Sequence, residues 1–242
     1  MTCFSLKILA LTTMLIDHIG AVFFPQYIWL RYIGRLSFPI YAFLLSEGFI
    51  HTHSRTKYAA RLFVFGIISE VPHDLAFYQK PLDFSSLNIM FELYLGVLAL
   101  SAVEILMDRK NKIYVRIISS VMLAVILFVS SYFNTSYGIY GIVLIISYYI
   151  FKSDHKFQAV SGAAVTIGFN SFQKVSLGIN GFSGNPMRIF NFNPLQSYAA
   201  VASVPILLYN GERGYRSKSK WFFYAFYPAH LIALYLIKIV IG

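Results

Sequence analysis

Residues 8–24 of the chain read ILALTTMLIDHIGAVFF, an apolar run that contains one carboxylate, Asp17, and one imidazole, His18. A helix of about 17 to 25 predominantly apolar residues is long enough to cross the hydrocarbon core of a bilayer. The run is therefore predicted to be a transmembrane helix. It lacks a clear small-residue cleavage site, and Asp17 and His18 interrupt its apolar region, so we interpret it as a retained first span rather than a signal peptide.

Runs of the same kind recur along the whole chain. Of its 242 residues 57% are hydrophobic and only 12% are charged, whereas a soluble domain is typically about 25% charged. The runs are too long and too apolar for the strands of a membrane barrel. The sequence therefore predicts an all-α, polytopic integral membrane helical bundle that forms a single domain over residues 1–242. About nine transmembrane helices are expected, at residues 7–24, 33–50, 59–78, 88–107, 113–131, 138–151, 157–172, 196–209 and 220–240.

The basic residues divide unevenly between the two sides that these spans define. Fourteen of the 20 Lys and Arg residues fall on the side of the N-terminus and the other 6 on the opposite side. Because basic residues collect in cytoplasmic loops, the N-terminus is predicted to be cytoplasmic and the C-terminus to lie outside the cell membrane. The same rule explains the net charge of +10, which therefore does not indicate nucleic-acid binding. Cys3 is the single cysteine and cannot form an intramolecular disulfide.

In this topology, a set of polar residues converges on the outer half of the bundle. Ionisable groups inside membrane spans are costly, and by default they are candidates for function. Neighbours on a helix point about 100° apart, so Asp17 and His18 are not expected to bond each other directly. Pro72 is expected to kink or end its helix. The alternative interpretation is a buried ion-pair network that fixes helix packing. The candidate catalytic residues are Asp17, His18, Arg35, Glu70, Asp74 and Asn88.

A second group of polar residues is expected at the inner end of the second span. Glu47 and His51 are four residues apart and share a helix face, and a cluster of basic residues follows them. Because Arg and Lys clusters bind phosphate, the group predicts a cradle for a phosphorylated cofactor. An ordinary basic cytoplasmic loop is the alternative. The cofactor-binding set is Glu47, His51, Arg55, Lys57, Tyr58 and Arg61, together with Arg213 in the turn YNGERGYRSK and His230 in the last span.

Motifs for other chemistries do not occur in the sequence. We find no nucleotide-binding glycine loop, no nucleophile elbow and no spacing of residues typical of zinc ligands. No metal is therefore expected.

The chain resembles the TraX family of bacterial membrane proteins. The resemblance rests on LKILALTTMLIDHIGAVFFP, RYIGRLSFPIYAFLLSEGFIHTHSRTKYAARLFVFGIISEVPHDLAF, YGIYGIVLI, LYNGERG and FYPAHL, which together run through most of the chain in order. The Asp-His-Ile-Gly and Glu-Gly-Phe-x-His-Thr pieces are fairly specific. The family is associated with N-terminal acetylation of conjugative pilin subunits, and more loosely the chain resembles other polytopic acyltransferases that use an intramembrane histidine.

The resemblance implies a membrane acetyltransferase that takes its acetyl group from cytoplasmic acetyl-CoA. The acceptor is a peptide or small-molecule amine, such as the N-terminus of a pilin-like peptide, or a hydroxyl. In this interpretation His18 is the general base, a carboxylate stabilises its imidazolium, and Asn88 or Arg35 stabilises the oxyanion. The basic inner loop holds the coenzyme A phosphates.

Two other functions are compatible with the same residues. The intramembrane Asp, His and Glu residues are also suited to the proton relay of a proton-coupled small-molecule transporter. Transporters commonly contain internal repeats, and no repeat stands out here. A purely structural or assembly role is the third possibility.

Overall fold

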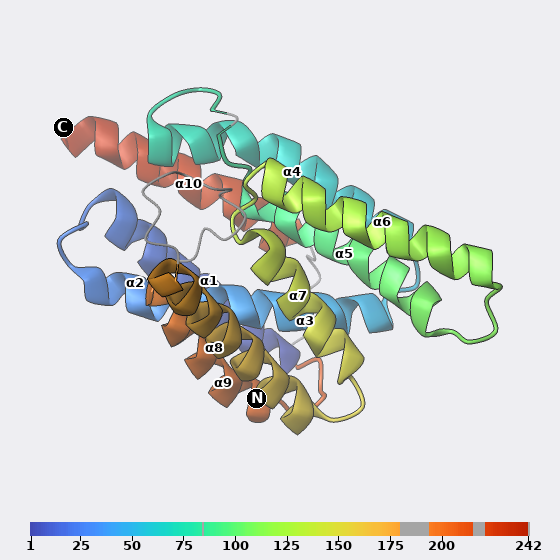
Figure 1. Cartoon of the computed structure of the whole chain (residues 1–242). Coiled ribbons are helices and arrows are strands. Elements are labelled where there is room, and N and C mark those ends of the chain that lie inside the picture. The colour runs from blue at the N-terminus through green and yellow to red at the C-terminus, as the bar shows by residue number, and fades with distance from the viewer. Residues whose placement is uncertain (84, 180–193, 215–220, 242) are drawn as a thin grey trace.

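The computed structural model describes residues 1–83, 85–179, 194–214 and 221–241, and these residues form helices joined by turns and loops, without a strand (Figure 1). The prediction of an all-α bundle is confirmed. In chain order the helices are α1 (Cys3–Val22), α2 (Ile28–Gly34), α3 (Ser37–His51), α4 (Arg55–Tyr78), α5 (Ile89–Met107), α6 (Ile113–Tyr132), α7 (Gly138–Ile150), α8 (His155–Ile179), the 3₁₀ helix η2 (Pro194–Ala202), α9 (Ser203–Leu207) and α10 (Trp221–Ile241).

Five helical stretches of the described chain are long and apolar enough to cross a membrane. They are α1, the combined α2–α3 stretch Ile28–His51, α5, α6 and α10. The helix α4 is not among them, because it carries Arg55, Lys57 and Arg61 in its first half and Glu70, His73 and Asp74 in its second half. The helix α7 and the stretch Leu195–Leu207 are apolar but shorter. Of the about nine predicted spans, the remaining four stay predictions.

Local sequence explains where several helices begin. The side chains of Thr2, Ser54 and Asn88 accept hydrogen bonds from the free backbone N–H groups at the starts of α1, α4 and α5, as N-cap residues do. Pro72 was expected to kink or end its helix, and it does not end it, because α4 continues to Tyr78. In membrane helices neighbouring groups can satisfy the backbone that a proline frees.

Two predicted spans differ from the structure in form. The span at 33–50 is two helices, α2 and α3, which meet at Arg35 and Leu36. The span at 196–209 is a 3₁₀ helix followed by the one-turn helix α9.

The core lies between α3, α5 and α7. Its side chains include Phe38, Phe43, Leu144 and Ile145, all at most 2% exposed. Gly96 on α5 lets the helices approach closely, because a Cβ there would lie 2.6 Å from the Cδ1 of Ile145. The helix α10 instead runs alongside α4, on the other side of the bundle (Figure 1).

The connections that carry most basic residues meet at one end of the bundle. Arg55 at the start of α4 forms an ion pair with Glu104 near the end of α5, and Tyr149 at the end of α7 donates to the same carboxylate over 3.3 Å. The backbone N–H of Cys3 donates to the carbonyl of Glu212 over 2.8 Å. We call this the inner end. The α1–α2, α4–α5 and α6–α7 connections lie at the opposite, outer end (Figure 1).

Candidate functional site

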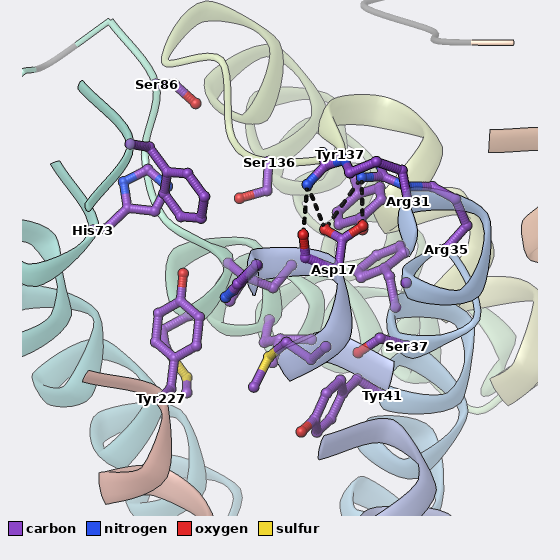
Figure 2. A pocket seen from close by; sticks show the side chains of 18 of the residues that line it. Asp17, Arg31, Arg35, Ser37, Tyr41, His73, Ser86, Ser136, Tyr137 and Tyr227 are labelled. Atoms are coloured by element: carbon purple, nitrogen blue, oxygen red, sulfur yellow. Dashed lines mark hydrogen bonds and ion pairs between the residues drawn. The ribbon is translucent and has the colours of Figure 1, made fainter. Parts of the chain in front are cut away.

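A cavity of about 290 Å³ opens in the outer half of the bundle (Figure 2). Its walls come from α1, α2, α3, α4 and α10 and from the starts of α5 and α7. Met14, Phe77 and Phe223 are part of its apolar lining. Its ionisable lining residues are Asp17, His18, Arg31, Arg35, Tyr41, His73, Tyr78, Tyr137 and Tyr227. A cavity in which polar groups converge beside apolar side chains is a candidate small-molecule site.

The carboxylate of Asp17 is held by two arginines. Arg31 donates to Oδ2 over 3.0 Å, and Arg35 donates to Oδ1 over 3.2 Å (Figure 2). Gly34 makes this contact possible, since a Cβ at that position would lie 2.1 Å from Oδ1 of Asp17. One negative charge faces two positive charges here, so the cluster presents an excess of positive charge to the cavity.

The partner of His18 is a second histidine, not a carboxylate. Its Nδ1 lies 2.7 Å from Nε2 of His230, and Nδ1 of His230 lies 2.8 Å from the carbonyl oxygen of Phe226. The expectation that Asp17 and His18 do not bond each other agrees with this arrangement. The idea of a carboxylate that stabilises the His18 imidazolium by contact does not, because Asp17 turns to the arginines.

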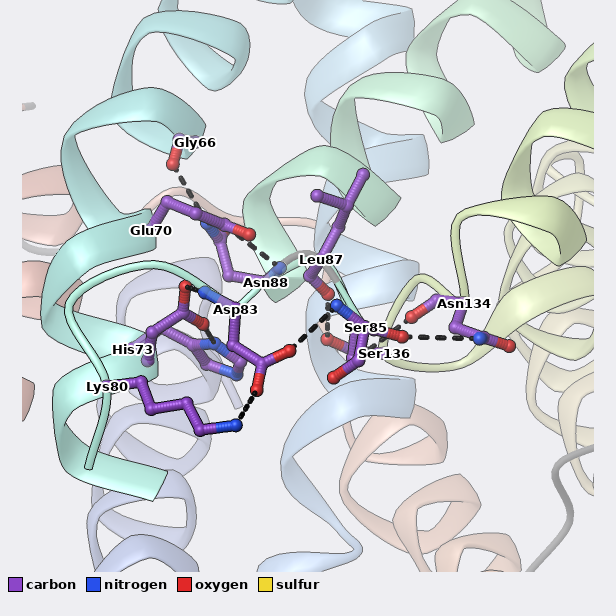
Figure 3. A network of polar contacts seen from close by, with 12 residues as sticks. Gly66, Glu70, His73, Lys80, Asp83, Ser85, Leu87, Asn88, Asn134 and Ser136 are labelled. Atoms are coloured by element: carbon purple, nitrogen blue, oxygen red, sulfur yellow. Dashed lines mark hydrogen bonds and ion pairs between the residues drawn. The ribbon is translucent and has the colours of Figure 1, made fainter. Parts of the chain in front are cut away.

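A pair of adjacent residues on α4 forms the carboxylate–histidine contact instead. Nδ1 of His73 lies 3.1 Å from Oδ1 of Asp74, which is fully buried (Figure 3). The other oxygen of Asp74 accepts the backbone N–H of Asp83 over 2.7 Å. Asp83 lies in the α4–α5 connection, where hydrogen bonds from Ser85 lower its pKa. The connection therefore braces Asp74 behind His73.

Asn88 and Glu70 bind each other away from the cavity lining. The side-chain amide of Asn88 donates to Oε2 of Glu70 and, over 2.8 Å, to the carbonyl of Gly66 (Figure 3). Its carbonyl oxygen accepts the N–H of Met90 over 2.9 Å. Both N–H groups of the amide are thus engaged in joining α4 to α5, which leaves no free donor for an oxyanion.

Glu92, one turn further along α5, anchors the turn before α7. Its carboxylate accepts hydrogen bonds from the hydroxyl of Thr135 and from the backbone N–H groups of Tyr137 and Gly138. Tyr137 stacks on Phe38 with ring centroids 3.6 Å apart and lines the cavity. A buried carboxylate with several donors is a structural anchor of this wall.

Most of the predicted cofactor-binding set lies at the inner end. Arg55 forms an ion pair with Glu104. Oε2 of Glu47 lies 3.8 Å from Nε2 of His51. Lys57 is exposed. Tyr58 packs its hydroxyl against Gly48, and Arg213 is exposed beside the N-terminus, where its carbonyl accepts the N–H of Phe4. His230 differs, because it lies against His18. The described residues contain no cluster suited to a metal ion.

The ionisable residues of the cavity lining that were absent from the predicted site are Arg31, Tyr41, His73, Tyr78, Tyr137 and Tyr227. Arg31 and His73 are charged or titratable residues in apolar surroundings, a signal that could have included them. Tyr137 and Tyr227 gave no such signal, since tyrosines are frequent throughout the chain. Their positions depend on how the helices pack.

These features define a polytopic helical membrane protein with a polar cavity inside its bundle. The chain belongs to the TraX protein family, which it matches over residues 4–238. It is 26% identical to "Probable fimbrial assembly protein FimC, serogroup H1" of Dichelobacter nodosus, over 96% of this chain and 94% of that protein. It is 25% identical to "Protein TraX" of Escherichia coli, over 64% of this chain and 59% of that protein. No solved structure matches the chain.

Proposed function

We propose that the chain is an acetyltransferase that moves an acetyl group from cytoplasmic acetyl-CoA to an amine held in the cavity, with His18 as general base. The observation that carries this proposal is the hydrogen-bond chain from Phe226 through His230 to His18.

The chain of hydrogen bonds assigns the proton positions on both rings. A carbonyl oxygen only accepts, so the Nδ1 of His230 that contacts Phe226 carries a proton. In the neutral ring the Nε2 of His230 is then an acceptor, and the Nδ1 of His18 donates to it. His18 is left with an unprotonated Nε2, and no described residue donates a hydrogen bond to that nitrogen. A neutral imidazole with a free lone pair beside a cavity is suited to general-base catalysis.

The chemistry follows from this arrangement. As the amine nitrogen attacks the thioester carbonyl, Nε2 of His18 takes up the proton that the amine loses. The carbonyl oxygen becomes an oxyanion, which the excess positive charge of Arg31 and Arg35 stabilises. The tetrahedral intermediate collapses to an amide when the carbon–sulfur bond breaks and the electron pair leaves with sulfur.

The cavity also reaches toward the inner end, where the donor would bind. Phe223 lines it, and Nζ of Lys7 lies 5.1 Å from the Phe223 ring. The guanidinium carbon of Arg61 lies 6.0 Å from the centroid of the Tyr224 ring. No carboxylate pairs with Lys7 or Arg61 among the described residues, whereas Arg55 is neutralised by Glu104. We therefore assign the main phosphate contacts to Lys7 and Arg61.

The helix geometry gives the length that the donor must cover. Lys7 and His18 are eleven residues apart on α1, which corresponds to about 16 Å. A donor whose phosphates bind at Lys7 must therefore carry its acetyl group on a long, narrow arm. The pantetheine arm of coenzyme A has this form.

The relatives favour a peptide as acceptor. The Dichelobacter nodosus protein is named for fimbrial assembly, so the N-terminal amine of a pilin-like peptide is the acceptor we propose to test first. The apolar part of the lining suits the apolar side chains of such a peptide.

A proton-coupled transporter is the second candidate, because the His18–His230 contact would also serve a proton relay. An experiment in detergent distinguishes the two functions, because no pH gradient exists there to drive transport. We expect the purified protein to transfer labelled acetyl from acetyl-CoA to a pilin-like peptide, with amide formation followed by mass spectrometry. Absence of product in detergent, together with pH-gradient-driven uptake by proteoliposomes, would support the transporter instead.

A further inference from the structure

A second imidazole, that of His73, lines the same cavity. The rings of His18 and His73 both pack against Phe77, at centroid distances of 5.1 Å and 5.2 Å. The two imidazoles are therefore no more than about 10 Å apart, with α1 and α4 on either side. Two imidazoles that line one cavity at this separation can serve one reaction as a separate acid and base.

The two histidines differ in what their Nδ1 atoms contact. His18 contacts a neutral ring, which favours a neutral imidazole. His73 contacts the carboxylate of Asp74 over 3.1 Å, and a carboxylate stabilises an imidazolium. The ring of Tyr78 on α4 lies 5.8 Å from the His73 ring, and Tyr227 of α10 and Arg31 of α2 line the same cavity. Of the two imidazoles, His73 is thus better placed to arrive at the reaction with a proton on Nε2.

We propose that His73 is a second catalytic residue, the general acid that protonates the leaving thiolate. The inference rests on the proposed acetyl transfer and adds a role that the transfer itself does not require. While His18 takes the proton that the amine loses, the carbon–sulfur bond breaks and its electron pair remains on sulfur. The proton on Nε2 of His73 passes to that sulfur and gives a neutral thiol. A proton moved from His18 to His73 through the cavity restores both rings.

Asp74 is the positioning residue for this acid. One of its oxygens contacts Nδ1 of His73, and the other is fixed by the backbone of Asp83. This leaves Nε2 as the nitrogen of His73 that can deliver a proton. Because Asp74 is fully buried, it acts through His73 and not on the substrate.

The test compares two donors that differ in how much their leaving group needs a proton. S-acetyl-N-acetylcysteamine releases an alkyl thiolate, and S-acetyl-4-nitrothiophenol releases an aryl thiolate that is stable without a proton. Neither carries phosphate, so contacts at the inner end do not distinguish them. Transfer to the peptide amine is measured for wild type, His73→Gln and His18→Gln, after subtraction of the uncatalysed rate.

We expect His73→Gln to lose about 10²-fold in rate with the alkyl donor, the scale of general-acid catalysis, and to stay within a few fold of wild type with the aryl donor. His18→Gln should lose activity with both. Asp74→Asn should show the same dependence on the donor, to a smaller extent. His53→Gln changes an exposed histidine outside the cavity and should match wild type with both donors.

Two results would overturn the proposal, one for His73 alone and one for the acetyl transfer as a whole. Equal loss with both donors in a His73→Gln protein of unchanged thermal stability would show that His73 is not the acid. Absence of product from wild type with acetyl-CoA and the same peptide would instead overturn the proposed acetyl transfer, and the role of His73 with it.

Discussion

His230 shows how one residue determines the chemistry of another. It follows His18 by 212 positions in the chain, and its ring is fixed by the carbonyl of the preceding helical turn. This contact makes the Nε2 of His230 an acceptor, and the acceptor in turn determines which nitrogen of His18 is free. In the proposed acetyl transfer His230 is therefore a positioning residue, whereas the sequence suggested donor binding for it.

The role of His230 predicts a rescue pattern. His230→Gln keeps a side-chain oxygen that can accept the Nδ1–H of His18, whereas His230→Phe keeps only ring volume. We expect the Phe variant to be at least about tenfold slower than the Gln variant in acetyl transfer, with a smaller difference in thermal stability. Equal rates for the two folded variants would show that the contact is only packing.

At the scale of elements, the bend between α2 and α3 builds the positive cluster. Because the chain turns at Arg35 and Leu36, Arg31 and Arg35 reach the same carboxylate on α1. The sequence indicated an apolar span over this stretch and placed Arg35 correctly near Asp17. It did not include Arg31, because the predicted span at 33–50 begins after that residue and left it in a connection.

A substitution at Gly34 tests how α2 packs against Asp17 of α1. We expect Gly34→Ala to force the Asp17 carboxylate away from the arginines, because the new Cβ would lie 2.1 Å from Oδ1. Overpacking of this kind costs about 1 to 3 kcal/mol and should lower the melting temperature in detergent. The matched control is Gly168→Ala on α8, where a Cβ meets nothing within 4 Å. A Gly34→Ala protein as stable as this control would contradict the described packing.

At the scale of the whole molecule, the length and hydropathy of the apolar runs were sufficient to predict the membrane bundle. They depend on local composition, which the sequence contains directly. The partners inside the bundle were harder to predict. Asn88 was expected to stabilise an oxyanion, but it caps α5 and joins it to α4. Such contacts depend on which helices become neighbours, and the spacing of residues within one helix does not determine that.

The orientation of the bundle in the membrane is a prediction of the same scale. In a Cys3→Ser background, a cysteine at Lys80 should react with an impermeant thiol reagent added to intact cells. A cysteine at Arg213 should react only after the cells are opened, since it lies at the inner end beside the N-terminus. The reverse pattern would place the basic connections outside, against the usual distribution of charge.

If His18 is the base for acetyl transfer inside the bundle, its replacement should slow the transfer and leave donor binding intact. Purified wild type, His18→Gln and His53→Gln are given labelled acetyl-CoA and a pilin-like peptide, and the rate of amide formation is measured. We predict that His18→Gln loses about 10² to 10⁴ in kcat while it still binds coenzyme A, and that His53→Gln is unchanged. A folded His18→Gln protein that forms the amide at the wild-type rate would show that His18 is not the base.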